Sequence, residues 1–300
     1  MELASILEIR RFATEQLALP ENGSYHSYVA LETPYPIWNV VAAPELSLTP
    51  KTWCFPIAGC VSYRGYFSET AATEFAQQLQ KNNFDTLVAG VPAYSTLSWF
   101  DDPVLSSFSS WPTPSVARLM FHELAHQQLY LPDDSAFSEA FATSVEIAGS
   151  KRWLEAYGSE KEIELFQRQL EREADFLGWT NSLHQRLAEL YASSMNDTKK
   201  RQHKREIIAA AQHGYLSLKK SWGGYTGYDK WVNSLNNARL VSIQTYRRLL
   251  PSFDVLLAES HYNFAKFYQV CKELAKQTPE QRRNFFVNRQ STQFVTQIKR

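Results

Sequence analysis

Two histidines separated by three residues constrain the middle of this chain more than any other feature. His122 and His126 flank the sequence Glu-Leu-Ala in a stretch whose apolar residues repeat at helical spacing. On an α-helix, residues four apart lie on one face about a turn from each other, so both imidazoles can reach one metal ion. The pattern therefore predicts a helix that presents two nitrogen ligands to zinc, with Glu123 beside them.

A catalytic zinc ion needs a third protein ligand, because such sites use three ligands and keep one position open. The residues LPDDS interrupt the helical pattern after His126, and Asp134 or Ser135 can cap a second helix that begins AFSEAFATSVE. Glu139 lies in the first turn of that helix, where a reversal of the chain can bring it to the histidine pair. His122, His126 and Glu139 are thus the predicted ligands of one zinc ion per chain.

Further residues near these ligands have predicted roles. Glu123 is offset from the histidine pair and is the predicted general base, which takes a proton from a zinc-activated water and returns it to the leaving amine. Thr143 and Glu146 follow Glu139 on the same helix face, and either can hydrogen-bond the second ring nitrogen of a ligand histidine. The alternative is an amphipathic helix whose histidines and glutamate simply face solvent. The apolar neighbours Phe121 and Leu124 argue against it.

The rest of the chain predicts an α+β protein of one domain, residues 1–300. Residues 1–112 are mainly sheet-forming, with a first helix before Pro20, strand candidates SYVALE, WNVVAA and VSYRGYF, a helix ETAATEFAQQLQKNN, and a strand DTLVAGVPAYSTL kinked at Pro92. Residues 113–158 hold the two active-site helices. Residues 159–300 are largely helical, interrupted by a Gly- and Tyr-rich loop HGYLSLKKSWGGYTGYDKW, and the tail from Thr278 is expected to lie on the surface.

Charge and hydropathy exclude several classes of partner. Lys plus Arg and Asp plus Glu number 31 each, so no overall field attracts nucleic acid, and the basic segment DTKKRQHKREII is read as a solvated helix face. No apolar run approaches the ~20 residues that span a bilayer, so no transmembrane segment is expected. A peptide or protein substrate is the expected partner, and the sequence leaves the oligomeric state open.

Two of the three cysteines lie close together in the sequence. Cys54 and Cys60 bracket FPIAG, whose proline and glycine can curl the chain and bring the two sulfur atoms together in an oxidising compartment. The alternative is two buried small apolar side chains. Both interpretations stay open at this point.

Several segments resemble a bacterial family described as putative zinc aminopeptidases, which are HExxH peptidases of the gluzincin type. The resemblance covers about Ile9 to Trp153 and recurs near the end, in the segments IRRFA, LPENGSYHSYV, WNVVAAPE, WCFPIAGCVSYRGYF, AYSTLSWFDDPVLSSF, FHELAHQQLY, FSEAFATSVE, NNARL and QTYRRLLPSF. The second helix of the family typically begins Phe-Asn-Glu, whereas Ser138 replaces that asparagine here.

This resemblance implies a zincin-like fold, in which a small mixed sheet packs on the active-site helix. It also implies a peptidase, and the family description suggests aminopeptidase action. No GxMEN-like anchor for a substrate ammonium group occurs in the chain. Members usually carry an envelope-targeting signal, which implies the bacterial periplasm or envelope if Met1 opens a trimmed chain, with the cytoplasm as the alternative. A catalytically silent, zinc-containing binding protein of the envelope is the alternative function.

Residues outside the motif are candidates for substrate contact in such a fold. A sheet edge beside the active-site helix can bind an extended peptide, so Tyr94 and Ser95 are predicted to line the cleft. Asn236 and Asn237 form an amide pair in a helical context, where a substrate-binding duty and a helix cap are both open. The oxyanion needs a donor besides zinc, and the sequence offers as candidates Tyr246 first, then Tyr130 or His213.

Overall fold

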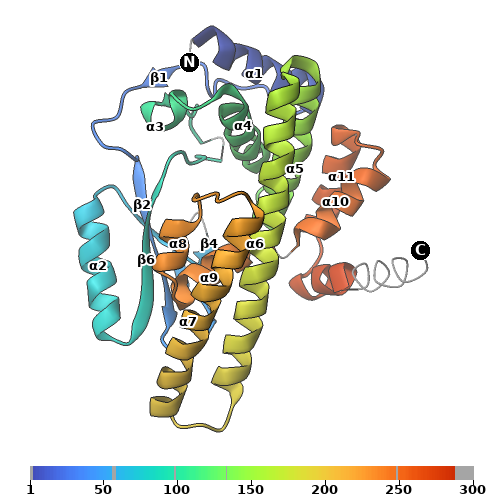
Figure 1. Cartoon of the computed structure of the whole chain (residues 1–300). Coiled ribbons are helices and arrows are strands. Elements are labelled where there is room, and N and C mark those ends of the chain that lie inside the picture. Colours follow the sequence, from blue (N-terminus) through green and yellow to red (C-terminus); the bar gives the residue numbers. More distant parts are fainter. Residues whose placement is uncertain (1–2, 56–58, 98, 133, 248, 288–300) are drawn as a thin grey trace. The chain divides into compact units, whose positions relative to one another are not determined.

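The computed structural model describes residues 3–55, 59–97, 99–132, 134–247 and 249–287, and confirms the α+β class (Figure 1). Its strands are β1 Tyr28–Val29, β2 Ile37–Pro44, β3 Trp53–Phe55, β4 Gly59–Val61, β5 Arg64–Tyr66, β6 Phe84–Val91 and β7 Val104–Leu105. Its helices are α1 Leu3–Leu17, α2 Glu69–Lys81, α3 Ser106–Ser109, α4 Thr113–Gln128, α5 Ser135–Tyr157, α6 Glu160–Ala192, α7 Asp197–Ser221, α8 Asp229–Asn233, α9 Asn237–Arg247, α10 Leu250–Glu259 and α11 Phe264–Ala275.

The chain divides into two compact units. Unit 1 consists of Met1–Pro36, Pro92–Glu162 and Thr245–Arg300, and unit 2 consists of Ile37–Val91 and Ile163–Gln244. The sheet-forming part predicted as residues 1–112 is therefore shared between the two units. Both helices of the HExxH region belong to unit 1.

Unit 2 contains a three-stranded antiparallel sheet in the order β5-β2-β6. Alternate residues of β2, Val40 and Ala42, are buried against Ala72, Ala76 and Leu79 of α2. The burial follows the period of two that a strand imposes, so α2 covers one face of this sheet. The strand predicted to run through Pro92 ends at Val91, because proline cannot donate the next ladder hydrogen bond.

The long helices α6 and α7 of unit 2 lie side by side (Figure 1) and bury Leu183, Leu187 and Ala211 in one apolar cluster. Much of the predicted Gly- and Tyr-rich loop is helical, since α7 continues to Ser221. It stops before two glycines, Gly223 and Gly224, with φ of +70° and +87°. These left-handed conformations suit glycine and end the helix where they occur.

The basic segment on α7 does not lie wholly in solvent as predicted. Lys204 is only 8% exposed, and its Nζ donates to Asp85 Oδ2 at 2.6 Å and to the Glu45 carbonyl at 2.9 Å. Arg201 Nε donates to the Glu45 carboxylate at 2.8 Å. These contacts hold α7 to the end of the sheet within unit 2. Lys204 and Arg201 of the basic segment therefore stabilise the fold.

Unit 1 is built around α4 and α5, which pack on each other, with α1 against α4 and α10 against α5. Aromatic side chains fill the space beside α5, including Phe141 with Phe267 at 5.6 Å between ring centroids and Phe137 with Phe253 at 5.0 Å. Among the helices in the described part of the chain, none has the length and hydrophobicity that a bilayer span requires.

The described part of the tail, residues 278–287, packs into unit 1 and does not simply lie on its surface, and the rest of the predicted tail is outside the described residues. Residues 279–287 are helical, Arg282 is 6% exposed and Phe286 is buried. The Phe286 ring lies 5.4 Å from the Phe253 ring and 6.3 Å from the Phe137 ring. The polar residues on the exposed side of this short helix favoured the prediction of a surface location, because the sequence alone does not show the apolar contact.

Gly149 of α5 lies close to side chains of both α1 and α4, which provides a test of the packing. A Cβ atom at this position would lie 2.7 Å from Leu17 Cδ1 and 3.1 Å from Phe121 Cδ2, and both neighbours are fully buried. We expect Gly149→Ala to lower the free energy of unfolding by ~1–3 kcal/mol through overpacking. Urea unfolding followed by circular dichroism measures this change.

The matched control is Gly178 in α6, where an added Cβ meets no described atom within 4 Å. There the gain in helix propensity acts alone, so Gly178→Ala should stabilise the protein by ~0.5–1 kcal/mol. Equal effects of the two substitutions would contradict the close packing at Gly149.

Candidate metal centre

Helix α4 places the HExxH residues at the boundary of the unit 1 core. Val116, Ala117, Met120 and Leu124 are fully buried and fix the apolar face of α4. A proline near the first turn supports its start, since the missing N–H is not needed there. The helix ends at Gln128. With one face fixed by the core, the polar residues of the motif are held at defined positions.

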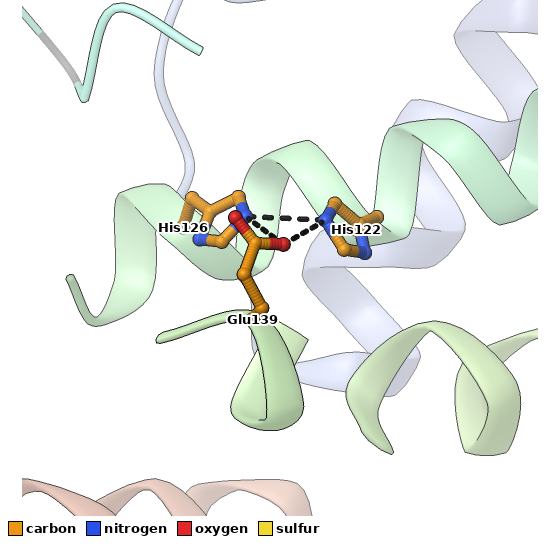
Figure 2. A group of neighbouring side chains, drawn as sticks. All are labelled: His122, His126 and Glu139. Carbon is orange, nitrogen blue, oxygen red and sulfur yellow. Dashed lines mark hydrogen bonds and ion pairs between the residues drawn. The ribbon is translucent and has the colours of Figure 1, made fainter. Parts of the chain in front are cut away.

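Helix α5 brings a carboxylate to the two histidines. His122 Nε2 and His126 Nε2 are 3.1 Å apart, and Glu139 Oε2 lies 3.4 Å from the first and 3.6 Å from the second. Figure 2 shows the carboxylate of Glu139 pointing between the two rings. One ligand atom from each of the three residues lies within 4.8 Å of the others. The predicted ligand set is thus brought together by two consecutive helices.

These distances fit a tetrahedral zinc site. Ligand atoms at ~2.0–2.1 Å from zinc in a tetrahedron are roughly 3.3–3.4 Å from one another, close to the three separations between His122, His126 and Glu139. The donor set of two imidazole nitrogens and one carboxylate oxygen is also the one that catalytic zinc uses. The residues present can therefore hold zinc.

Glu146 fixes the orientation of one ligand ring. Its Oε2 lies 2.8 Å from His122 Nδ1, and its other oxygen accepts a hydrogen bond from Arg118 Nε. Because a carboxylate accepts, we assign the proton of His122 to Nδ1, which leaves the Nε2 lone pair for a metal. Thr143 is buried on α5, but among the described side chains none links its hydroxyl to either histidine ring. Of the two predicted partners, Glu146 makes the contact.

The group is strongly coupled electrostatically. Burial opposes ionisation of Glu139, yet the neighbouring His126 and His122 lower its pKa to about 2. Burial likewise opposes ionisation of Glu146, and Arg118 and His122 lower its pKa to about 2. Burial raises the pKa of Glu123, and the two histidines only partly offset it. Two carboxylates are thus held as anions, while the third has the greater proton affinity that a general base needs.

A family model described as "Putative aminopeptidase" matches residues 1–286, which is nearly the whole chain. The chain belongs to this putative aminopeptidase family. No curated protein and no solved structure matches it. The description suggests that this family member is a peptidase.

A partly buried polar network supports α4 of this family member on the side of Gln127. Gln127 Nε2 donates to Asp102 Oδ2 at 2.9 Å and to Ser24 Oγ at 3.1 Å, and Gln127 Oε1 accepts from Asn22 Nδ2 at 2.8 Å. Asp102 is 3% exposed and also accepts from the Thr96 backbone N–H at 3.1 Å. Two loops distant in sequence are thereby attached to the residue next to His126.

The first turn of α5 is held from both sides. Asp134 caps the helix by accepting from the Phe137 N–H at 3.1 Å, and its other oxygen accepts from Arg282 Nε at 3.0 Å and Nη2 at 2.8 Å. Ser138 Oγ accepts from the Leu131 N–H at 3.0 Å. Ser138 therefore ties the α4–α5 connection directly to the turn that carries Glu139.

Two predicted substrate-contact residues, Tyr94 and Ser95, lie beyond the end of β6 in a loop of unit 1, not on a strand edge. Tyr94 is exposed, and Ser95 Oγ accepts from the Leu97 N–H at 3.1 Å. The loop departs from strand geometry because Pro92 ends the ladder. A contact of either residue with substrate stays a prediction.

The predicted amide pair Asn236 and Asn237 lies in unit 2, where it binds backbone groups. Asn236 Nδ2 donates to the Thr86 carbonyl at 2.9 Å, and Asn237 Nδ2 donates to the Pro44, Glu45 and Ser47 carbonyls at 2.9–3.0 Å. Tyr191 donates to Asn237 Oδ1 at 2.9 Å. The pair thus joins the start of α9 to the sheet, and any role in substrate binding stays a prediction.

The three oxyanion-donor candidates differ in position. Tyr246 lies in α9, and its side chain is outside those that the structure describes. The ring of Tyr130 lies 6.2 Å from the ring of His126, whereas His213 is on α7 in unit 2.

Cys54 and Cys60 lie opposite each other on β3 and β4 and are joined by a disulfide with an S–S distance of 1.96 Å. Both cysteines are exposed, unlike the buried pair of the alternative interpretation. The hairpin that they close lies in unit 2.

Proposed function

We propose that this chain is a zinc-dependent peptidase of the gluzincin type, with one zinc ion held by His122, His126 and Glu139. The observation that carries the proposal is the convergence of His122 Nε2, His126 Nε2 and Glu139 Oε2 at separations of 3.1–3.6 Å. The family description supports a peptide as the substrate and release of N-terminal residues as the reaction.

Each of the site residues has a separate role in the proposed hydrolysis. Bound zinc supplies a Lewis acid that makes a water molecule acidic enough to attack a peptide carbonyl near neutral pH. Glu123 accepts the proton of the attacking water and delivers it to the leaving amine. Glu146 and Arg118 keep the His122 ring in the orientation and tautomer that a ligand requires.

We also propose that the protein works in an oxidising compartment such as the bacterial periplasm. The Cys54–Cys60 disulfide supports this location, because disulfides persist outside the reducing cytoplasm.

A peptide library tests the proposed activity. We expect the zinc-loaded protein to cleave library peptides, to lose activity when a chelator removes the metal, and to recover it when zinc is restored. Mass spectrometry of the products identifies the cleaved bond. Peptides with free and acetylated N-termini, compared in the same assay, distinguish release of N-terminal residues from internal cleavage.

A fully zinc-loaded protein that cleaves no peptide would contradict the peptidase proposal and favour a silent zinc-containing binding protein. Cleavage of free and acetylated peptides at equal rates would contradict the aminopeptidase assignment alone.

A further inference from the structure

The segment Asn22–Tyr25 lies along the face of α4 that carries Glu123. Asn22 and Ser24 both bond the side chain of Gln127, at 2.8 and 3.1 Å. Gln127 is four residues after Glu123, and residues four apart share one face of a helix. Tyr25, the next residue of the segment, is therefore near the turn of α4 that carries the proposed general base.

The backbone of Tyr25 is held in an unusual conformation. Its φ is +66°, in the left-handed region that bulky residues rarely adopt. Neighbouring contacts fix this conformation, since the Tyr25 N–H donates to the Asp102 carbonyl at 2.6 Å and Arg10 Nε donates to the Ser24 carbonyl at 3.0 Å. Conformations of this kind persist where the surroundings over-determine them, and they cluster at functional sites.

The Tyr25 hydroxyl and the Glu123 carboxylate are complementary groups that both lack a direct partner. Tyr25 is 2% exposed, and its buried hydroxyl forms no direct hydrogen bond with any residue that the structure describes. Glu123 is 9% exposed, and within the described part of the chain no side chain or backbone group hydrogen-bonds its carboxylate. Their placement on one face of α4 agrees with the electrostatics, since burial and then the charges of Glu123 and Asp102 raise the pKa of Tyr25.

A buried donor without an acceptor costs stability, so an orphaned phenol beside an orphaned carboxylate needs an explanation. We propose that Tyr25 is a positioning residue for Glu123, and that its hydroxyl donates to the Glu123 carboxylate through one bridging water. Such a bridge costs little more than a direct hydrogen bond and restrains the carboxylate as a proton acceptor. The inference rests on the proposed function, in which Glu123 is the general base.

Tyr25→Phe tests this role, since it keeps the ring and removes only the hydroxyl. We expect kcat for peptide hydrolysis to fall roughly tenfold, the scale of losing a supporting contact, while KM and zinc content stay at wild-type values. The unfolding midpoint should fall by less than the loss of a direct hydrogen bond causes, because the hydroxyl reaches Glu123 only through water in this proposal.

Tyr268→Phe is the matched control. Tyr268 is as buried as Tyr25 and belongs to the same unit, but its hydroxyl donates to the Leu17 carbonyl at 2.8 Å. This variant should lower the unfolding midpoint and leave kcat unchanged. A merely structural role for Tyr25 predicts the same result for Tyr25→Phe, and wild-type kcat in that variant would overturn the proposal.

A second measurement is independent of catalysis. Unfolding midpoints of wild type, Tyr25→Phe, Glu123→Ala and the double variant, all at saturating zinc, form a double-mutant cycle. We expect the two substitutions to be non-additive, and additivity would overturn the contact. If wild type cleaves no peptide, the proposed function fails, and this cycle still decides whether Tyr25 and Glu123 interact.

Discussion

Glu123→Gln is expected to lower kcat by ~10²–10⁴ while zinc content and fold are retained. Glu123 lies outside the group of three ligand atoms, so its replacement should leave the metal in place. An amide of the same shape cannot accept the proton of the attacking water. The loss should therefore fall on kcat far more than on KM, which steady-state kinetics and elemental analysis of the same preparation measure.

Glu155→Gln provides the control for this experiment. Glu155 is exposed on α5, and the substitution makes the same chemical change away from the three ligands. It should leave kcat and zinc content at wild-type values. A Glu123→Gln protein that cleaves peptide as fast as wild type would exclude the general-base role even if the ligand assignment holds.

Glu139→Gln is expected to lower zinc occupancy and peptidase activity together. Its Oε2 is the single carboxylate oxygen in the group of three ligand atoms, and a neutral amide is a much weaker ligand for zinc. The zinc affinity should fall by more than the ~10–100-fold that losing a supporting partner costs. Titration with a competing chelator measures this affinity, and added zinc should restore part of the activity.

Glu146→Gln gives the graded comparison. Glu146 contacts His122 Nδ1 and is not in the ligand group, so its loss should weaken zinc binding by only ~10–100-fold. If Glu139→Gln keeps full occupancy under conditions that strip Glu146→Gln, the third ligand is assigned wrongly.

Local periodicity predicted most of the elements. The spacing of apolar residues indicated α1 and α4, because each of these helices buries one face. Helix α5 is buried on all sides near its start and was indicated by its cap and its ending glycine. The extent of α7 and the packing of residues 279–287 were predicted wrongly. In both segments the exposed face is polar and the decisive contacts involve residues far away in the sequence, which a local pattern does not report.

Of the candidate site, too, one part could be predicted from local sequence and another part could not. The residues that the sequence brought forward, His122, His126, Glu139 and Glu146, are related by helical spacing and one turn, so short-range geometry sufficed to group them. Tyr25 and Asp102 could not be found by this route. They reach α4 only because the N-terminal segment and the loop after β6 fold back onto it, and no local signal encodes that return.

The ion pair between Arg282 and Asp134 bears on how the protein is made. Residues that can bind the metal leave the ribosome first, whereas the guanidinium group of Arg282 emerges 148 residues after the cap residue Asp134 that it contacts. We expect the ligand residues of the nascent chain to stay incompletely positioned until residues 279–287 pack on unit 1. The metal would then bind only after this packing, and an incomplete chain would have little peptidase activity.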